Sequence, residues 1–223
     1  GNIGVPMLDF LEVKVDYFVV ELSSQQLELF DADIEYGIFT SFFPDHMDYH
    51  GSFEKYMQAK FRFFDCVETL IVNVKNPLVA DYLKVQEAGG DFSGANRRLG
   101  GKYIAFANQV NYVTDTLVWI ASDSYDLSDS NIKGEDMLCN FLGVFLLGRE
   151  LGIEEDVILE VANSFEYLQH RQQVIKVDGS DLIYVNDSAS VTPESTVSAL
   201  KAFRDLNIQA LILGGMDRGY DYS

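Results

Sequence analysis

The sequence has little positive charge and few cysteines, and each shortage excludes a class of protein. Lysine and arginine number 16 against 35 aspartates and glutamates, so the 223 residues carry a formal net charge of -19. Nucleic acids and anionic membranes are bound through basic patches, and we therefore expect neither as a partner. The two cysteines, Cys66 and Cys139, lack the CxxC spacing of zinc and redox sites. We expect buried, reduced thiols, and a disulfide is the less favoured alternative.

Long apolar runs and a phosphate-binding loop are also missing. No segment has the roughly 20 consecutive apolar residues of a membrane-spanning helix, and the first residues lack the basic stretch of a signal peptide. We therefore expect a soluble, cytoplasmic protein. A G-x-x-x-x-G-K-[ST] loop is absent: around the Gly-Lys pair at 101–102, Asn96 replaces the first glycine and Tyr103 replaces the serine or threonine.

The most informative stretch is residues 40–64, TSFFPDHMDYHGSFEKYMQAKFRFF. An apolar run at residues 36–43 predicts a strand, and helical spacing predicts a helix over residues 53–66. Between them stand four side chains with oxygen or imidazole donors: Asp45, His46, Asp48 and His50. The pattern predicts a strand that delivers metal ligands at its end.

Lys60 has an unusual place in the predicted helix. It shares a face with Phe53, Tyr56 and Phe64, and no acidic residue stands four positions away on either side. Burial disfavours the charged amine, so part of Lys60 would be a neutral nucleophile able to capture carbon dioxide. The resulting carbamate is an oxygen ligand for a hard cation such as Mg²⁺. Spacing alone favours the ordinary alternative, a lysine that extends its ammonium to water over a core helix.

Hydrophobic patterning along the rest of the chain predicts an α/β fold, a mostly parallel sheet flanked by helices. Helices are expected at residues 77–86, 136–151 and 154–165, and Pro193 suits the first turn of another. Strands are expected at residues 16–22, 69–74, 103–106, 172–177, 182–186 and 210–213, with a β-hairpin over residues 110–125.

The string DHMDYHGSFEKYMQAKFRFF resembles the signature DHxDxH-x₅-Y-x₂-AK-x₂-IF of the Mur ligases, ATP-dependent enzymes that add amino acids to the peptidoglycan precursor. ELSSQQLE, residues 21–28, resembles ELSSFQLE of the D-glutamate-adding (MurD-type) branch. Further family motifs follow in order along the whole chain. The resemblance implies a Mur ligase central, ATPase-like domain at residues 1–168 and the beginning of a Rossmann-like C-terminal domain at residues 169–223.

The resemblance also implies a catalytic centre that uses ATP and two Mg²⁺ ions. Its metal ligands would be Glu21, His46 and a carbamylated Lys60. Imidazole is softer than the ligands Mg²⁺ usually takes, so His46 would share the ion with oxygen ligands.

Three separate motifs are implied to bind ATP. Asn140 would contact adenine, although DMLCN keeps only the last asparagine of the family's HNxxN. Arg171, in a variant of the LPHR hinge (LQHR), would reach the phosphates. Asp187, in the strand-end NDS motif, would bind the ribose.

The remaining implied contacts are to the other two substrates. Asn2 in GNIG would bind the nucleotide-sugar substrate, Ser23 and Ser24 would be further substrate contacts, and Arg218 in GGMDRG would bind the carboxylate of D-glutamate. The family's NDSKAT is NDSASV here, so Thr192 would replace its threonine one place displaced.

The reaction implied joins D-glutamate to UDP-N-acetylmuramoyl-L-alanine through an acyl phosphate, in a protein expected to be a monomer. Because the family's phosphate-binding loop and UDP-binding domain are not found, we expect a fragment that is inactive alone. Two alternatives stay open, a folylpolyglutamate synthase-like ligase of the same superfamily and a non-enzymatic binding module without the loop. ELSSQQLE and GGMDRG favour the D-glutamate-adding branch.

Overall fold

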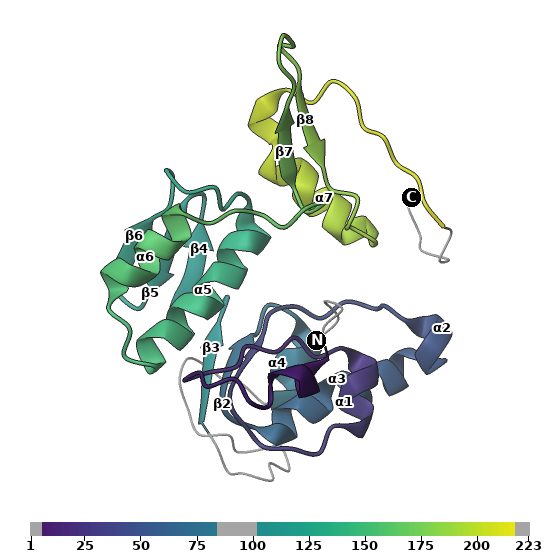
Figure 1. The fold of residues 1–223 in the computed structure, drawn as a ribbon, viewed down its shortest axis with the longest axis vertical. Coiled ribbons are helices and arrows are strands. Elements are labelled where there is room, and N and C mark those ends of the chain that lie inside the picture. Colours follow the sequence, from purple (N-terminus) through teal and green to yellow (C-terminus); the bar gives the residue numbers. More distant parts are fainter. Residues whose placement is uncertain (1–5, 84–101, 217–223) are drawn as a thin grey trace. The chain divides into compact units, whose positions relative to one another are not determined.

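The computed structural model describes residues 6–83 and 102–216 (Figure 1). The chain forms two compact units that divide after Ala105. The first unit packs helices on a parallel pair of strands, and the described part of the second combines an antiparallel sheet, a β-hairpin, three α-helices and a 3₁₀ helix. The expected α/β class is confirmed. None of the helices within the described residues has the length and hydrophobicity needed to cross a membrane.

The first unit is built around one parallel strand–helix–strand crossover. Strand β1 (Ile34–Phe39) pairs in parallel with β2 (Val67–Asn73), in the register Phe39 to Val72, and β3 (Lys102–Phe106) follows β2 in the sheet. Helix α3 (Phe53–Cys66) makes the crossover, as parallel strands require. The other helices of this unit are the 3₁₀ helix η1 (Met7–Phe10), α1 (Ser24–Leu29), α2 (Met47–His50) and α4 (Pro77–Leu83).

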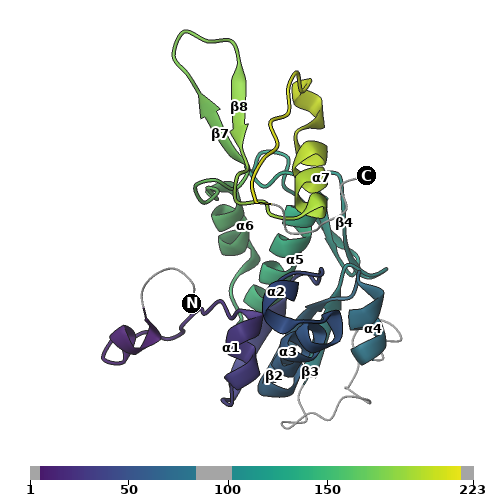
Figure 2. The same ribbon diagram turned by 90° about the vertical axis from the view of Figure 1, so that its right-hand side faces the viewer.

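Helix α3 begins and ends where the sequence predicts. Ser52 caps its start by accepting a 3.3 Å hydrogen bond from the Lys55 N–H. One face buries Tyr56 and Phe64 completely, and α1 lies beside α3 in both views (Figures 1 and 2). Phe64 is in edge contact with Phe39 of β1, with ring centroids 4.8 Å apart. The aromatic face therefore fixes the helix on the sheet.

The second unit begins with a three-stranded antiparallel sheet, β4 (Asn111–Thr114), β5 (Leu117–Ile120) and β6 (Asp123–Asp126). The expected hairpin is thus a meander with a third strand, because the chain turns tightly twice. The first residue of each turn has a positive φ, Asp115 (φ 49) in one and Ala121 (φ 55) in the other. A positive φ at this position gives a two-residue turn the twist that matches the flanking strands. Helix α5 (Glu135–Glu150) packs on β4 and β5 and against α6 (Glu155–Asn163).

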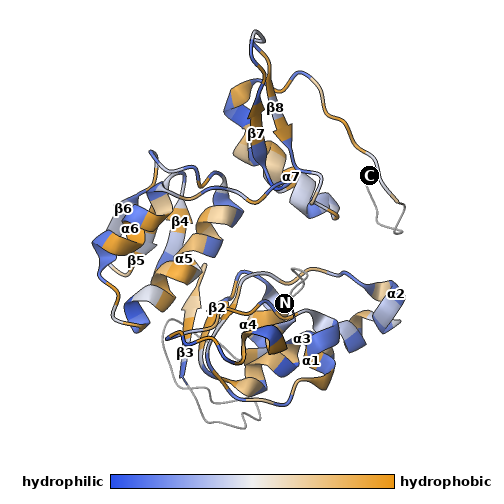
Figure 3. Cartoon of the chain, viewed as in Figure 1, coloured by the Kyte–Doolittle hydropathy of each residue, from blue (hydrophilic) through white to orange (hydrophobic). Residues whose placement is uncertain are grey.

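The last described part contains the hairpin β7 (Gln173–Lys176) and β8 (Ile183–Asn186), helix α7 (Pro193–Ala202) and the 3₁₀ helix η2 (Arg204–Leu206). The hairpin strands carry apolar residues beside the polar Gln173, Lys176 and Asn186 (Figure 3), and Val174, Ile183 and Tyr184 are exposed. Helix α7 reaches α5 where Gly134 has φ 84, and a Cβ on Gly134 would lie 2.7 Å from Ala202 Cβ. The glycine therefore allows this approach.

Two expected strands are wrong. Residues 16–22 and 210–213 form no strand, and Val19 and Ile212 are 100% and 94% exposed. Apolar runs become strands only where another strand offers hydrogen-bonding groups, and neither run is paired within the described residues. The strand expected at residues 36–43 is β1, which ends at Phe39, where its register with β2 ends. Cys66 and Cys139 are buried thiols that form no disulfide, as expected.

Candidate functional site

The DHMDYH motif begins beyond the carboxyl end of β1, the side on which parallel sheets carry their sites. Its first histidine, His46, has φ 56 and ψ 34 and directly precedes α2. This left-handed backbone is unfavourable for a residue with a Cβ and is found mainly where function or surrounding contacts require it. Asp45 stabilises it by accepting a 2.7 Å hydrogen bond from the His46 N–H, and His46 Nε2 lies 3.4 Å from Asp45 Oδ2.

Lys60 lies half-buried on the predicted face of α3. Burial lowers the pKa of its amine, whereas the negative charges of Glu21 and Asp45 act in the opposite direction, and the net pKa is lowered. The direction agrees with the expectation that burial disfavours the charged amine. The absence of an acidic residue at helical spacing was misleading, because both carboxylates come from segments distant in sequence.

The donors near Lys60 suit a hard cation in their chemistry. Glu21 and Asp45 contribute carboxylate oxygens, and His46 contributes an imidazole beside Asp45. Residues 6–83 and 102–216 contain no preformed group of three or more His, Cys, Asp or Glu side chains that could hold a metal. The ligand set of Glu21, His46 and a carbamylated Lys60 stays a prediction.

Ser23 and Ser24 begin helix α1 and face different surroundings. Ser23 caps the helix reciprocally with Gln26, its Oγ accepting from the Gln26 N–H at 3.3 Å and its N–H donating to Gln26 Oε1 at 2.9 Å. Ser24 is only 1% exposed, and its Oγ lies 2.9 Å from His50 Nε2. As arranged here, Ser24 is directed into the protein and not toward a substrate.

The interaction of Ser24 with His50 was not foreseen from the sequence. It extends to Glu28, whose Oε1 lies 3.0 Å from His50 Nδ1 and whose Oε2 accepts a 3.2 Å hydrogen bond from the Tyr49 hydroxyl. The sequence pattern indicates His50 as a possible metal ligand and gives no sign of this contact. The imidazole is buried and contacts Tyr56, and a metal-binding role for His50 stays a prediction.

Arg171 and Asp187 come together at the base of the β7–β8 hairpin. The N–H of Gln172, next to Arg171, donates a 3.0 Å hydrogen bond to Asp187 Oδ1, and Asn186 Nδ2 lies 3.0 Å from His170 Nδ1. The Arg171 side chain itself is exposed. The structure therefore places the LQHR and NDS motifs beside each other, and their binding of one nucleotide stays a prediction.

The other predicted contacts are more dispersed. Asn140 is half-exposed on α5, with Nδ2 3.9 Å from Met137 Sδ, and the hydrogen bonds around Asp187 do not include it. Thr192 caps α7, and its Oγ1 accepts a 3.3 Å hydrogen bond from the Ser195 N–H. Asn2 and Arg218 lie outside the described residues.

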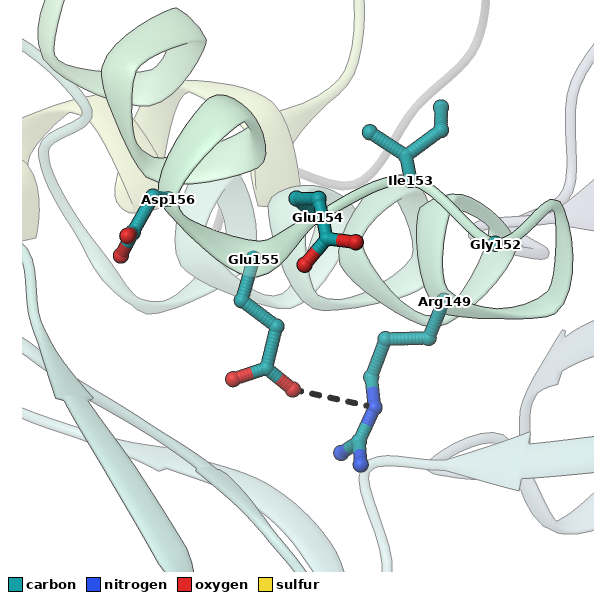
Figure 4. A pocket seen from close by; sticks show the side chains of 6 residues that line it. All are labelled: Arg149, Gly152, Ile153, Glu154, Glu155 and Asp156. Atoms are coloured by element: carbon teal, nitrogen blue, oxygen red, sulfur yellow. Dashed lines mark ion pairs between the residues drawn. The ribbon is translucent and has the colours of Figure 1, made fainter.

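A surface hollow of about 450 Å³ lies between the end of α5 and the start of α6 (Figure 4). Its lining residues are Arg149, Gly152, Ile153, Glu154, Glu155 and Asp156. The one basic group, Arg149, is paired with Glu155 at 3.3 Å. Three carboxylates against one paired arginine make this hollow unsuitable for phosphates, and it contains none of the predicted site residues.

The family model of the Mur ligase middle domain matches residues 2–148, the part of the chain that contains both ligand-bearing motifs. The chain belongs to the Mur ligase family. Its relatives include UDP-N-acetylmuramoylalanine–D-glutamate ligases of Vibrio cholerae serotype O1 and Clostridium beijerinckii, 32% and 31% identical over 100% of this chain. The chain covers 49% and 47% of these two proteins, so it spans about half the length of the curated relatives it matches.

Solved structures of Mur ligases share the fold. MurF from Acinetobacter baumannii matches 76% of this chain and 37% of its own, with a TM-score of 0.54 at 11% identity. UDP-N-acetylmuramate-alanine ligase MurC from Thermotoga maritima matches 81% of this chain and 41% of its own, with a TM-score of 0.53 at 15% identity. Identities this low support the fold alone. The domain boundary near residue 168 stays a prediction.

Proposed function

We propose that this chain is part of an ATP-dependent ligase that joins D-glutamate to UDP-N-acetylmuramoyl-L-alanine in peptidoglycan precursor synthesis. The observation that carries the proposal is the half-buried Lys60, with a lowered pKa, near Glu21 and Asp45. An ordinary surface lysine would keep its ammonium in water. Burial lowers the pKa of the Lys60 amine more than the two carboxylates raise it, and this favours the neutral form that carbamylation needs. The D-glutamate ligases among the relatives support the choice of amino acid.

In this proposal the site residues hold the ion that neutralises negative charge on the phosphate groups during two steps. The substrate carboxylate attacks the γ-phosphorus of ATP, ADP leaves, and an acyl phosphate forms. The amine of D-glutamate then attacks the acyl carbon, phosphate leaves, and the amine proton is lost to a base. Mg²⁺, when bound, would neutralise the phosphate charge during both steps. Glu21, His46 and carbamylated Lys60 would hold and orient it, and Asp45 would hold His46 in place.

The ATP contacts in the proposal come from the second unit. Arg171 would meet the phosphates, Asp187 the ribose and Asn140 the adenine. The hydrogen bond between Gln172 and Asp187 supports the first two, because it keeps their segments together. Asn2, Ser23, Thr192 and Arg218 are proposed for the other substrates, and Ser24 would act indirectly.

The deciding experiment is a ligase assay of the full-length protein that contains this chain. The assay would contain UDP-N-acetylmuramoyl-L-alanine, ATP, Mg²⁺ and one of three amino acids: D-glutamate, L-glutamate or meso-diaminopimelate. ADP release and the ligated product would both be measured. We expect product with D-glutamate alone, and its loss in Asp45→Ala and Lys60→Ala. Residues 1–223 alone should be inactive, since their sequence contains no G-x-x-x-x-G-K-[ST] loop to hold the phosphates.

Other outcomes of the same assay identify the alternatives. Product with a folate acceptor and L-glutamate would indicate the folylpolyglutamate synthase-like ligase. Binding of the nucleotide sugar without ADP release from any acceptor would indicate the non-enzymatic module. Either result would contradict the proposed function.

A further inference from the structure

Helix α2 is too short to be stable without contacts from other elements. It has only four residues, and both flanking residues are left-handed, His46 with φ 56 and Gly51 with φ 73. A helix this short is not stable alone, because nucleation is unfavourable and few hydrogen bonds follow it. The left-handed backbone of His46 is also unfavourable for an L-residue with a Cβ. Contacts from other elements must therefore keep α2, and with it His46, in place.

His50, the last residue of α2, makes such contacts. Its side chain is 0% exposed. One ring nitrogen, Nε2, lies 2.9 Å from Ser24 Oγ of helix α1, and the ring meets Tyr56 of α3 edge-on with centroids 5.5 Å apart. A buried imidazole thus connects α2 with two neighbouring helices.

The second ring nitrogen faces a carboxylate. His50 Nδ1 lies 3.0 Å from Glu28 Oε1, at ion-pair distance, although its N–H is not aligned for a hydrogen bond. The Ser24 hydroxyl donates a 3.2 Å hydrogen bond to Gln25 Oε1, which leaves its oxygen as the acceptor toward His50 Nε2. Ser24 and Glu28, both on α1, therefore meet the imidazole at its two ring nitrogens. The other Glu28 oxygen accepts a 3.2 Å hydrogen bond from the Tyr49 hydroxyl, and this bond is exposed to solvent.

The positions of these residues relate the contact to the proposed metal ligands. Ser24 follows Glu21 by three residues, and His50 follows His46 by four. We infer that the Ser24–His50–Glu28 contact is a positioning device that sets Glu21 and His46 relative to each other, with His50 as its central positioning residue. This inference rests on the proposed function for the role of Glu21 and His46. It assigns Ser24 a structural part in the site in place of a direct substrate contact.

The two ring nitrogens can be tested separately in the full-length protein. Glutamine places its Nε2 near the position of imidazole Nε2, whereas asparagine reaches only the position of Nδ1. His50→Gln should therefore keep the contact with Ser24, and His50→Asn should lose it. Tyr49→Phe is the matched control, because it removes a neighbouring hydrogen bond to Glu28 and leaves the imidazole unchanged.

Three measurements distinguish positioning from a merely structural role: Mn²⁺ affinity with ATP present, kcat of the ligase assay, and amide hydrogen exchange of residues 47–50. Loss of a group that orients a metal ligand typically lowers metal affinity or activity by about 10–100-fold, and we expect a loss of this size in His50→Asn. Exchange in α2 should become faster in the same variant. His50→Gln and Tyr49→Phe should stay close to the wild type in all three.

The inference is overturned if folded His50→Asn binds Mn²⁺ as tightly as the wild type, or if His50→Gln loses as much affinity as His50→Asn. A lower melting temperature with unchanged Mn²⁺ affinity and kcat would also contradict it. If His50→Asn does not fold, Ser24→Ala, which removes only the hydroxyl, must weaken Mn²⁺ binding, and wild-type affinity in Ser24→Ala overturns the inference. A wild-type protein that binds Mn²⁺ without ligating D-glutamate contradicts the proposed function and leaves these comparisons valid.

Discussion

The carboxylate of Asp187 accepts a 3.0 Å hydrogen bond from the backbone N–H of Gln172. Gln172 has φ 46, an unusual backbone conformation for a glutamine, and is 8% exposed. The same carboxylate accepts from the Ser190 hydroxyl through its other oxygen. Each carboxylate oxygen has two lone pairs, so these bonds leave acceptor capacity for a ligand hydroxyl. Asp187 therefore has two separable tasks, to hold the chain near Arg171 and to bind ribose in the proposed ligase.

Substitutions of Asp187 should separate these tasks. Asp187→Asn keeps an oxygen for the Gln172 N–H but loses the charge, so the full-length enzyme should stay folded while its KM for ATP rises. Loss of a hydrogen bond to a charged group corresponds to a rise of about 10-fold. Asp187→Ala should show the same rise and also lower the free energy of unfolding by about 1 kcal/mol. Steady-state kinetics and urea unfolding measure the two effects.

The critical comparison for Asp187 is between the change in KM for ATP and the change in KM for D-glutamate. In both variants the KM for ATP should rise more than the KM for D-glutamate. A larger rise for D-glutamate would mean that the NDS motif has been assigned to the wrong substrate.

Lys60 offers a sharper test of the proposed centre. Because burial lowers the pKa of its amine, the neutral form can attack carbon dioxide, forming an N–C bond and releasing a proton. Lys60→Ala should lower kcat of the full-length enzyme by about 10²–10³-fold, and a small carboxylate in the assay should restore part of it. Lys60→Glu should retain more activity than Lys60→Arg, since only glutamate keeps the negative charge of a carbamate.

A direct readout accompanies the kinetics. In the full-length protein supplied with ¹³C-bicarbonate, a carbamate carbon resonance should appear and should be absent from Lys60→Arg. If Lys60→Arg is the more active variant and no such resonance appears, the lysine acts as a cation and the carbamate is wrong.

Sequence patterns succeeded where local chemistry decides the structure. Helix α3 begins at Phe53 and ends at Cys66 as predicted, because its capping serine and aromatic face are both local features. The start of α7 at Pro193 is equally local, since proline suits a first turn. The face occupied by Lys60 could be predicted for the same reason.

Features that depend on contacts between distant segments could not be predicted from local sequence patterns. The apolar run at residues 16–22 has the composition of a buried strand, but whether it pairs depends on another segment of chain. Glu21 and Asp45 act on Lys60 although they lie 39 and 15 positions away in the sequence. Glu28 and Ser24 meet His50 across two helices, and no local spacing indicates this contact.

Thr192 tests whether a predicted substrate residue has a structural task. Its hydroxyl caps α7 reciprocally with Ser195. Thr192→Ala should lower the free energy of unfolding by about 1 kcal/mol, and Thr192→Ser, which keeps the hydroxyl, should stay close to the wild type. Chemical denaturation of the full-length protein measures both. Equal stability of all three proteins would show that the cap contributes nothing, whereas a change in the KM for D-glutamate in Thr192→Ser would favour a substrate contact.

Tyr125 provides a prediction on pH that does not depend on the proposed function. Burial, followed by the 2.7 Å hydrogen bond to Glu155, raises the pKa of its phenol from 10.0 to about 12. As pH rises from 10 toward 12, the unfolded chain releases this proton first, so the contribution to stability is complete below pH 10 and is lost as pH approaches 12. The difference in phenolate absorbance between wild type and Tyr125→Phe should therefore have its midpoint near 12. Above pH 10 the stability of the wild type should fall more steeply than that of Tyr125→Phe, and a midpoint near 10 would show that Glu155 and burial do not hold the proton.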